Sequence, residues 1–194
     1  MIEILAAIIG TIYIILEYKA SPWLWPFNIL MALMYVYVFF DNGVYAQMLI
    51  QVYYVFIGVY GWLEWKGLLK NGKKEEKPIT SLPKKLYLPV IITTIALSIA
   101  ISLILKQIPG NEVWLLDGVS TALSVVAMWL LAKKYYQQWI FWIIVEPIII
   151  LMSLQTEMYA TAVLYLIYTI IAIMGYFKWK KQSLRIQADA LNIG

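Results

Sequence analysis

Cysteine and histidine are both absent from this chain of 194 residues, and charged side chains are scarce. Without Cys and His the protein cannot form disulfides, bind a metal through thiolate or imidazole groups, or use a Cys- or His-based nucleophile system. We therefore expect no cofactor and no metal site. An intramembrane enzyme would need a paired acid and base, and the apolar segments carry only one central acid, so we do not expect an enzyme.

Charged residues make up 13% of the chain and hydrophobic residues 63%. Soluble domains contain about 25% charged and about 45–50% apolar residues, so this excess of apolar side chain must face lipid. The net charge is +4, but the basic residues lie in short segments between apolar runs and form no basic face. These features predict an integral membrane protein and argue against a nucleic-acid partner.

The apolar residues gather in windows of about 20 residues, the length of helix that crosses a bilayer core about 30 Å thick. Turn signals such as Asp41-Asn42-Gly43 and Pro109-Gly110-Asn111 separate these windows. No basic leader or cleavage site precedes the first window, so we expect it to be a retained helix. The sequence predicts an all-α integral membrane fold with seven spans, at residues 2–19, 24–40, 44–66, 86–108, 114–132, 138–155 and 158–179.

The basic residues predict the orientation of these spans, because Lys and Arg concentrate on the cytoplasmic side. Lys106 is the single one of the 15 basic residues that lies in the alternate set of connecting segments. Seven spans then place the N-terminus outside and the C-terminus in the cytoplasm. The other set contains Lys19, Lys66, Lys70, Lys73, Lys74, Lys77, Lys84, Lys85, Lys133, Lys134, Lys178, Lys180, Lys181 and Arg185.

Shifting the chain by 114 positions aligns its two halves without a gap. The shift brings Trp25 onto Trp139, Gly61 onto Gly175 and Trp65 onto Trp179. This register predicts a 3+1+3 parallel repeat with the substrate site between the repeats, an arrangement found in some transporters. The predicted parts are a first three-helix repeat (1–66), a cytoplasmic loop (67–85), a connector helix (86–108), a second three-helix repeat (111–180) and a cytoplasmic tail (181–194).

Glu146 is the acid that lies in the middle of a predicted span, with Trp142 and Trp139 four and seven residues before it. An ionisable residue in a membrane span is costly and by default functional. A carboxylate beside indole rings suits a flat organic cation, which can pair with the acid and make cation–π contacts with the rings. Trp139 lies near a span end, where an interfacial anchor is an equal alternative, and Glu146 could instead hydrogen-bond another helix.

Further polar residues lie within the spans and can orient a ligand by hydrogen bonds. Gln51 and Tyr54 form a polar stripe with Gly58 in the third span, while the tyrosines of this chain also serve as packing residues. The remaining candidate substrate-binding residues are Asn28, Asp117, Thr121 and Tyr168.

These residues together resemble the PnuC family of vitamin transporters over nearly the whole chain. The resemblance rests on Trp23-Leu24-Trp25-Pro26, Tyr60-Gly61-Trp62-Leu63-Glu64-Trp65, Asp117 through Ser124, Trp139-x2-Trp142-x3-Glu146 and Gly175-Tyr176-Phe177-Lys178-Trp179. It implies a SWEET-like full-length fold, a homotrimer in membrane lipid and a location in the bacterial cytoplasmic (inner) membrane. It further implies facilitated diffusion of an unphosphorylated vitamin, which a cytoplasmic vitamin kinase then traps.

The identity of the vitamin depends on Glu146, which stands where the nicotinamide riboside branch of the family has Asn. A carboxylate between indoles suits the permanent thiazolium charge of thiamine, so we favour thiamine as the substrate. Nicotinamide riboside is also a cation and is the alternative, while riboflavin is larger and uncharged. A substrate-binding subunit of a larger energised transporter, and proton coupling through Glu146, also stay open.

Overall fold

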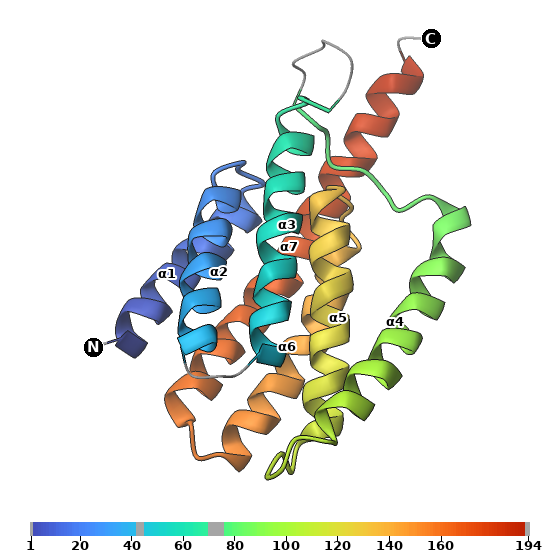
Figure 1. Ribbon diagram of the computed structural model, residues 1–194. Helices are drawn as coiled ribbons and strands as arrows, with labels where there is room; N and C mark the ends of the chain where they lie inside the picture. The colour runs from blue at the N-terminus through green and yellow to red at the C-terminus, as the bar shows by residue number, and fades with distance from the viewer. Residues whose placement is uncertain (1, 42–44, 70–75, 193–194) are drawn as a thin grey trace. The chain divides into compact units, whose positions relative to one another are not determined.

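The computed structural model describes residues 2–41, 45–69 and 76–192. Over these ranges the chain forms seven helices (Figure 1), namely α1 (Ile2–Tyr18), α2 (Leu24–Asp41), α3 (Tyr45–Trp65), α4 (Lys84–Leu105), α5 (Trp114–Ala132), α6 (Gln138–Gln155) and α7 (Tyr159–Asn192). The predicted turn at 42–43, three of the basic residues (70, 73 and 74) and the last two residues of the predicted tail lie outside the described ranges.

The all-helical prediction is confirmed, and most helix bounds fall within two residues of the predicted spans. Among the described residues, α2, α4, α5, α6 and α7 are long and apolar enough to cross a membrane. α1 offers a shorter apolar helix, Ile9–Tyr18. α3 carries more polar side chains, including Gln51 and Glu64. Membrane crossing by α1 and α3 therefore stays a prediction.

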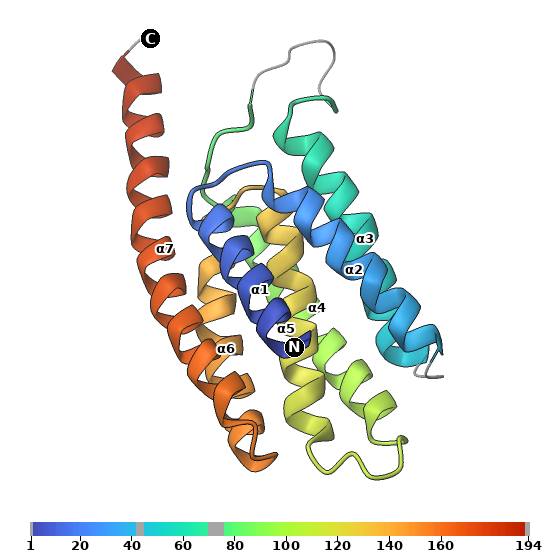
Figure 2. The same ribbon diagram turned by 90° about the vertical axis from the view of Figure 1, so that its left-hand side faces the viewer.

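The chain divides into two compact units, each of which is described by itself. Unit 1 contains residues 1–77 together with Ala132–Lys134, and unit 2 contains residues 78–131 and 135–194. In unit 1, α2 lies along α3, and in unit 2, α6 lies along α7, as Figure 1 and Figure 2 show.

The α2–α3 pair in unit 1 is held together by two tryptophans and a glycine. Trp25 and Trp65 are fully buried and meet edge to face, with ring centroids 5.5 Å apart. Gly61 on α3 lies directly against the Trp25 ring, where a Cβ atom would collide with the indole. Small residues allow such close approach between membrane helices, which gain little from hydrophobic burial in lipid.

The α6–α7 pair in unit 2 repeats this packing. Trp139 and Trp179 are fully buried and meet edge to face, with ring centroids 5.6 Å apart. A Cβ atom on Gly175 would lie 2.6 Å from Cε2 of Trp139. The three residues of each cluster are those that a shift of 114 positions aligns.

The helix ends recur with the same spacing. α1 ends at Tyr18 and α5 at Ala132, and α2 begins at Leu24 and α6 at Gln138, each 114 positions apart. Ala20 and Lys134, which this shift also aligns, both have a left-handed backbone, with φ of 55° and 58°. A non-glycine residue rarely adopts this conformation, so its recurrence reflects the same tight turn in both places.

The rest of unit 2 is built around α5. Leu82 and Val90 pack with Val126 and Leu130 in one buried cluster. Ser102 on α4 lies against Gly118 on α5, where a Cβ atom would meet its hydroxyl. Residues 78–83 pair with the α5–α6 turn through a parallel bridge between Thr80 and Tyr135.

α7 is the longest helix and extends beyond the predicted span. It contains 34 residues, so its axis is about 51 Å long at about 1.5 Å per residue. The described part of the predicted tail is therefore a continuation of α7.

We predict that Gly175→Ala lowers the thermal stability of the purified protein, because the new methyl group must displace the Trp139 ring. Overpacking of this kind costs about 1–3 kcal/mol. Differential scanning fluorimetry in detergent would measure the change in Tm. Gly61→Ala should behave alike, and the double variant Gly175→Ala, Trp139→Phe should recover part of the loss. An unchanged Tm in Gly175→Ala would show that the contact is not tight.

Candidate functional site

Glu146 lies on α6 in unit 2 and is 5% exposed. Trp142 is half-buried one turn earlier, and its indole Nε1 atom is buried without a hydrogen-bond partner among the described residues. Pro147 follows Glu146 and lacks the N–H that would bond the carbonyl one turn back. This part of α6 therefore contains a buried carboxylate and an indole N–H without a hydrogen-bond partner among the described residues. It also lacks one backbone hydrogen bond of the helix.

Trp139 has a different environment from Trp142. Its ring is fully buried between Gly175 and Trp179, so the surface of the ring is used in the packing of α6 against α7. The structure gives Trp139 a packing role, and its contact with a ligand stays a prediction.

Asp117, Thr121 and Tyr168 also belong to unit 2. The side chains of Thr121 and Asn111 hydrogen-bond the Asp117 carboxylate at the start of α5. Tyr168 on α7 meets the ring of Tyr165 edge to face, with centroids 5.5 Å apart. Asp117 and Thr121 are therefore joined by a hydrogen bond within α5, and their contact with a ligand stays a prediction.

Asn28, Gln51 and Tyr54 belong to unit 1 and are all half-buried. A Cβ atom on Gly58 would lie 2.7 Å from the Asn28 Oδ1 atom, so the glycine on α3 makes room for the amide on α2. This Oδ1 atom is buried and accepts no hydrogen bond from the described part of the chain. Tyr54 lies beside Tyr53, with ring centroids 5.7 Å apart.

Several buried polar residues were not singled out from the sequence, and Glu17 and Gln138 have the lowest exposure among the carboxyl and amide side chains. Glu17, near the end of α1, is 2% exposed, and Gln138, the first residue of α6, is fully buried. The signal for Glu17 was an acid inside the first apolar window. Gln138 gave no such signal, because a Gln at the start of a span reads as a polar flank.

A cluster of charged side chains lies at the end of α3 in unit 1. Glu64 pairs with Lys77 and lies 3.8 Å from the ammonium of Lys133, which also bonds the Tyr60 hydroxyl. Lys134 is 5% exposed, and its ammonium lies 4.3 Å from the centroid of a Trp65 ring. Burial lowers the pKa of Lys134 to about 8, while Glu76 acts in the opposite direction and Lys77 adds to the shift.

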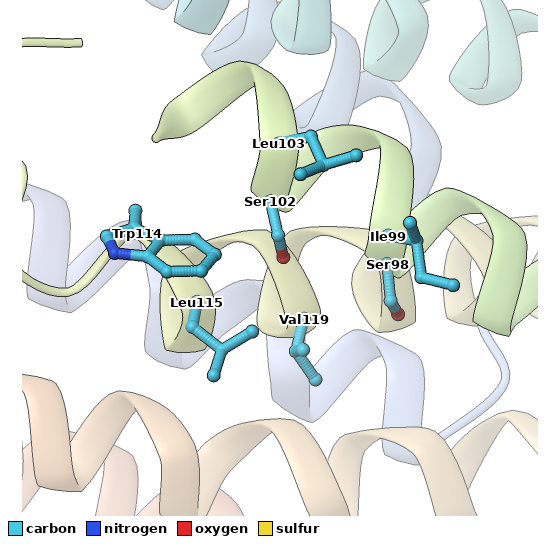
Figure 3. Close-up of a pocket in the computed structure, with 7 residues that line it drawn as sticks. All are labelled: Ser98, Ile99, Ser102, Leu103, Trp114, Leu115 and Val119. Atoms are coloured by element: carbon cyan, nitrogen blue, oxygen red, sulfur yellow. The ribbon is translucent and has the colours of Figure 1, made fainter. Parts of the chain in front are cut away.

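A cavity of about 260 Å³ lies between α4 and α5 in unit 2 (Figure 3). Its lining is mostly apolar, with the hydroxyls of Ser98 and Ser102 and the ring of Trp114. None of the candidate substrate-binding residues lines it.

Comparison with known proteins gives consistent similarities. Residues 1–181 match the sequence model of a family described as nicotinamide mononucleotide transporters. The nicotinamide riboside transporter PnuC of Escherichia coli (strain K12) is 25% identical over 176 residues, which cover 79% of this chain and 74% of that protein. PnuC of Haemophilus influenzae is 25% identical, with 93% of this chain and 79% of that protein covered.

One solved structure is similar in fold. The crystal structure of the vitamin B3 transporter PnuC has a TM-score of 0.71 and 23% sequence identity. The match covers 93% of this chain and 80% of that chain.

We predict that Lys134 loses its proton near pH 8, well below the value of about 10.4 for a free lysine side chain. NMR of the ¹³C-dimethylated protein would measure the titration, and the signal missing in Lys134→Met identifies it. Because the folded state then binds fewer protons than the unfolded state, stability should rise as the pH increases from about 8 to about 10. Titration of the Lys134 signal at about pH 10.4 would contradict the burial argument.

Proposed function

The chain belongs to the family of nicotinamide mononucleotide transporters that includes PnuC, and from this membership we propose that it carries a small, positively charged vitamin across the membrane. The chain is a multi-pass membrane transporter and not an enzyme. We propose nicotinamide riboside as the vitamin, since the relatives from Escherichia coli and Haemophilus influenzae are named as nicotinamide riboside transporters.

The observation that carries this proposal is the buried carboxylate of Glu146 beside Trp142. A buried acid attracts a cationic ring, and an indole adds cation–π attraction. The same carboxylate repels a phosphate group. The unphosphorylated nucleoside therefore fits this environment better than the mononucleotide in the family's description.

Thiamine, which the sequence favoured, is the second candidate. The comparisons give that preference no support, but its physical basis is Glu146 in place of the Asn of the nicotinamide riboside branch. A permanent thiazolium cation needs a counter-ion more than it needs an amide. We propose that Asp117, Thr121 and Tyr168 bind the vitamin along with Glu146 and Trp142, all in unit 2. We also propose that Asn28, Gln51 and Tyr54 of unit 1 contact the vitamin during transport.

The transport mechanism that we propose is facilitated diffusion driven by metabolic trapping. The recurring helix ends and Trp–Gly–Trp clusters support a 3+1+3 parallel repeat, similar to a SWEET-like full-length transporter, whose halves alternate access to the ligand. A cytoplasmic kinase would remove the free vitamin. The homotrimer and the outside N-terminus rest on the family resemblance and on the distribution of lysine.

The orientation of the chain in the membrane can be tested by labelling introduced cysteines, because the chain has no cysteine of its own. Single cysteines placed at Lys181 and Glu112 should react with a membrane-impermeant maleimide from opposite sides of the membrane. Labelling of Lys181→Cys from the cytoplasmic side supports a cytoplasmic C-terminus, and labelling from outside excludes it.

We predict that the purified protein alone moves radiolabelled nicotinamide riboside into liposomes, because facilitated diffusion needs no energised partner. Nicotinamide mononucleotide should not compete, thiamine tests the second candidate, and an imposed pH gradient should leave the rate unchanged. Binding without uptake would favour a substrate-binding subunit of a larger transporter. A rate that follows the pH gradient would favour proton coupling.

We also predict that Glu146→Gln weakens binding of the cationic vitamin more than tenfold, because the substitution removes the counter-charge and keeps the shape. Quenching of tryptophan fluorescence measures the affinity. Glu112→Gln is the matched control, since Glu112 is exposed between α4 and α5. Equal affinity in wild type and Glu146→Gln would remove the charge argument.

A further inference from the structure

Gln138, the first residue of α6, has a fully buried side-chain amide. Its exposed fraction is 0%, and neither its Nε2 nor its Oε1 atom has a hydrogen-bond partner within the described residues. Burial of a polar group without a hydrogen bond is costly, and an amide carries both a donor and an acceptor. Most buried polar side-chain atoms in proteins are paired, so this residue requires a physical explanation.

The preceding residue shows what a structural amide looks like in the same turn. Gln137 is 4% exposed, and both of its polar atoms are paired. Its Oε1 atom accepts from the backbone N–H of Leu82, and its Nε2 atom donates to the hydroxyls of Ser81 and Tyr87, each at 2.9 Å. Hydrogen bonds of the Gln137 side chain therefore join residues 81–87 to the start of α6. The Gln138 side chain makes no such hydrogen bond within the described residues.

The corresponding position in the first half of the chain holds an apolar residue. The residue 114 positions earlier is Leu24, which is the first residue of α2 and is also fully buried. The local backbone is the same, since the N–H of Leu24 bonds Ser21 at 3.2 Å and the N–H of Gln138 bonds Tyr135 at 3.2 Å. A leucine fills this position in one place and a glutamine in the other.

Gln138 also lies in line with the residues proposed to bind the vitamin. Gln138, Trp142 and Glu146 follow one another at four-residue intervals on α6, so neighbouring members share a helix face. Eight residues of helix place Gln138 about 12 Å along the axis from Glu146. The Nε1 atom of Trp142 between them is also buried and without a partner in the described part of the chain.

We propose that Gln138 binds the transported vitamin through a group that carries a donor and an acceptor side by side, at a point of the pathway separate from Glu146. This inference rests on the proposed function. A carboxamide, as in nicotinamide riboside, complements the Gln138 side chain with two parallel hydrogen bonds. A ligand with a carboxylate in place of the carboxamide offers only acceptors. The Nε2 atom of Gln138 can donate to it, but the Oε1 atom of Gln138 then has no donor. A retained cost in stability is typical of residues that serve function.

The test compares Gln138→Leu and Gln138→Met with wild type in proteoliposomes. Leu is the residue of the corresponding position, and Met keeps the length of Gln without its hydrogen-bonding atoms. Initial rates of uptake are measured for nicotinamide riboside and for nicotinic acid riboside, in which a carboxylate replaces the carboxamide. The Tm of each variant is measured in detergent, with Gln137→Leu as the variant that loses structural hydrogen bonds.

We expect both Gln138 variants to keep or raise the Tm and to reduce uptake of nicotinamide riboside at least fivefold. Their preference for nicotinamide riboside over nicotinic acid riboside should also shrink at least fivefold, which a structural role would not cause. Gln137→Leu should lower the Tm. Unchanged uptake and preference in both Gln138 variants would overturn the proposal, as would a fall in Tm matching that of Gln137→Leu. Absence of uptake by wild type would instead reject the proposed function.

Discussion

Contact between a tryptophan ring and a glycine holds each of the two main helix pairs, and the other features depend on this contact. Lipid is as apolar as leucine, so helices in a membrane associate through close packing rather than through hydrophobic burial. Gly61 and Gly175 let the helix backbones approach the flat faces of Trp25 and Trp139. The second tryptophan of each cluster meets the first edge to face, an arrangement that aromatic rings prefer. These contacts fix the faces that α2 and α6 turn toward their partners.

The sequence predicted the helices well because membrane spans leave a strong one-dimensional signal. A window of apolar residues closed by Ser21-Pro22 or Pro109-Gly110 is sufficient to find a helix and its end. The continuation of α7 beyond Trp179 could not be found in this way, because its residues are polar and hydropathy marks only where a span ends. The union of Ala132–Lys134 with unit 1 depends on tertiary contacts with α3, which a linear pattern does not contain.

A candidate site residue could be predicted from the sequence where its polarity differs from that of the residues around it in the chain. Glu146 is such a residue, since a carboxylate within an apolar window is costly wherever the helix turns. Trp139 was ambiguous because an indole suits packing, anchoring and ligand contact alike, and its packing role emerged only from Gly175. Gln138 was missed since its importance lies in what surrounds it. Two adjacent glutamines look the same in sequence, and only the three hydrogen bonds of Gln137 distinguish them.

The length of α7 has a practical consequence for imaging. Each chain has a mass of only 22.4 kDa, so it adds little mass outside the detergent belt. α7 continues as a regular helix from Trp179 to Asn192, so a soluble helical protein can be fused to its end without a break in the helix. Such a fusion would move with α7 as one body and would supply the mass needed to align particle images.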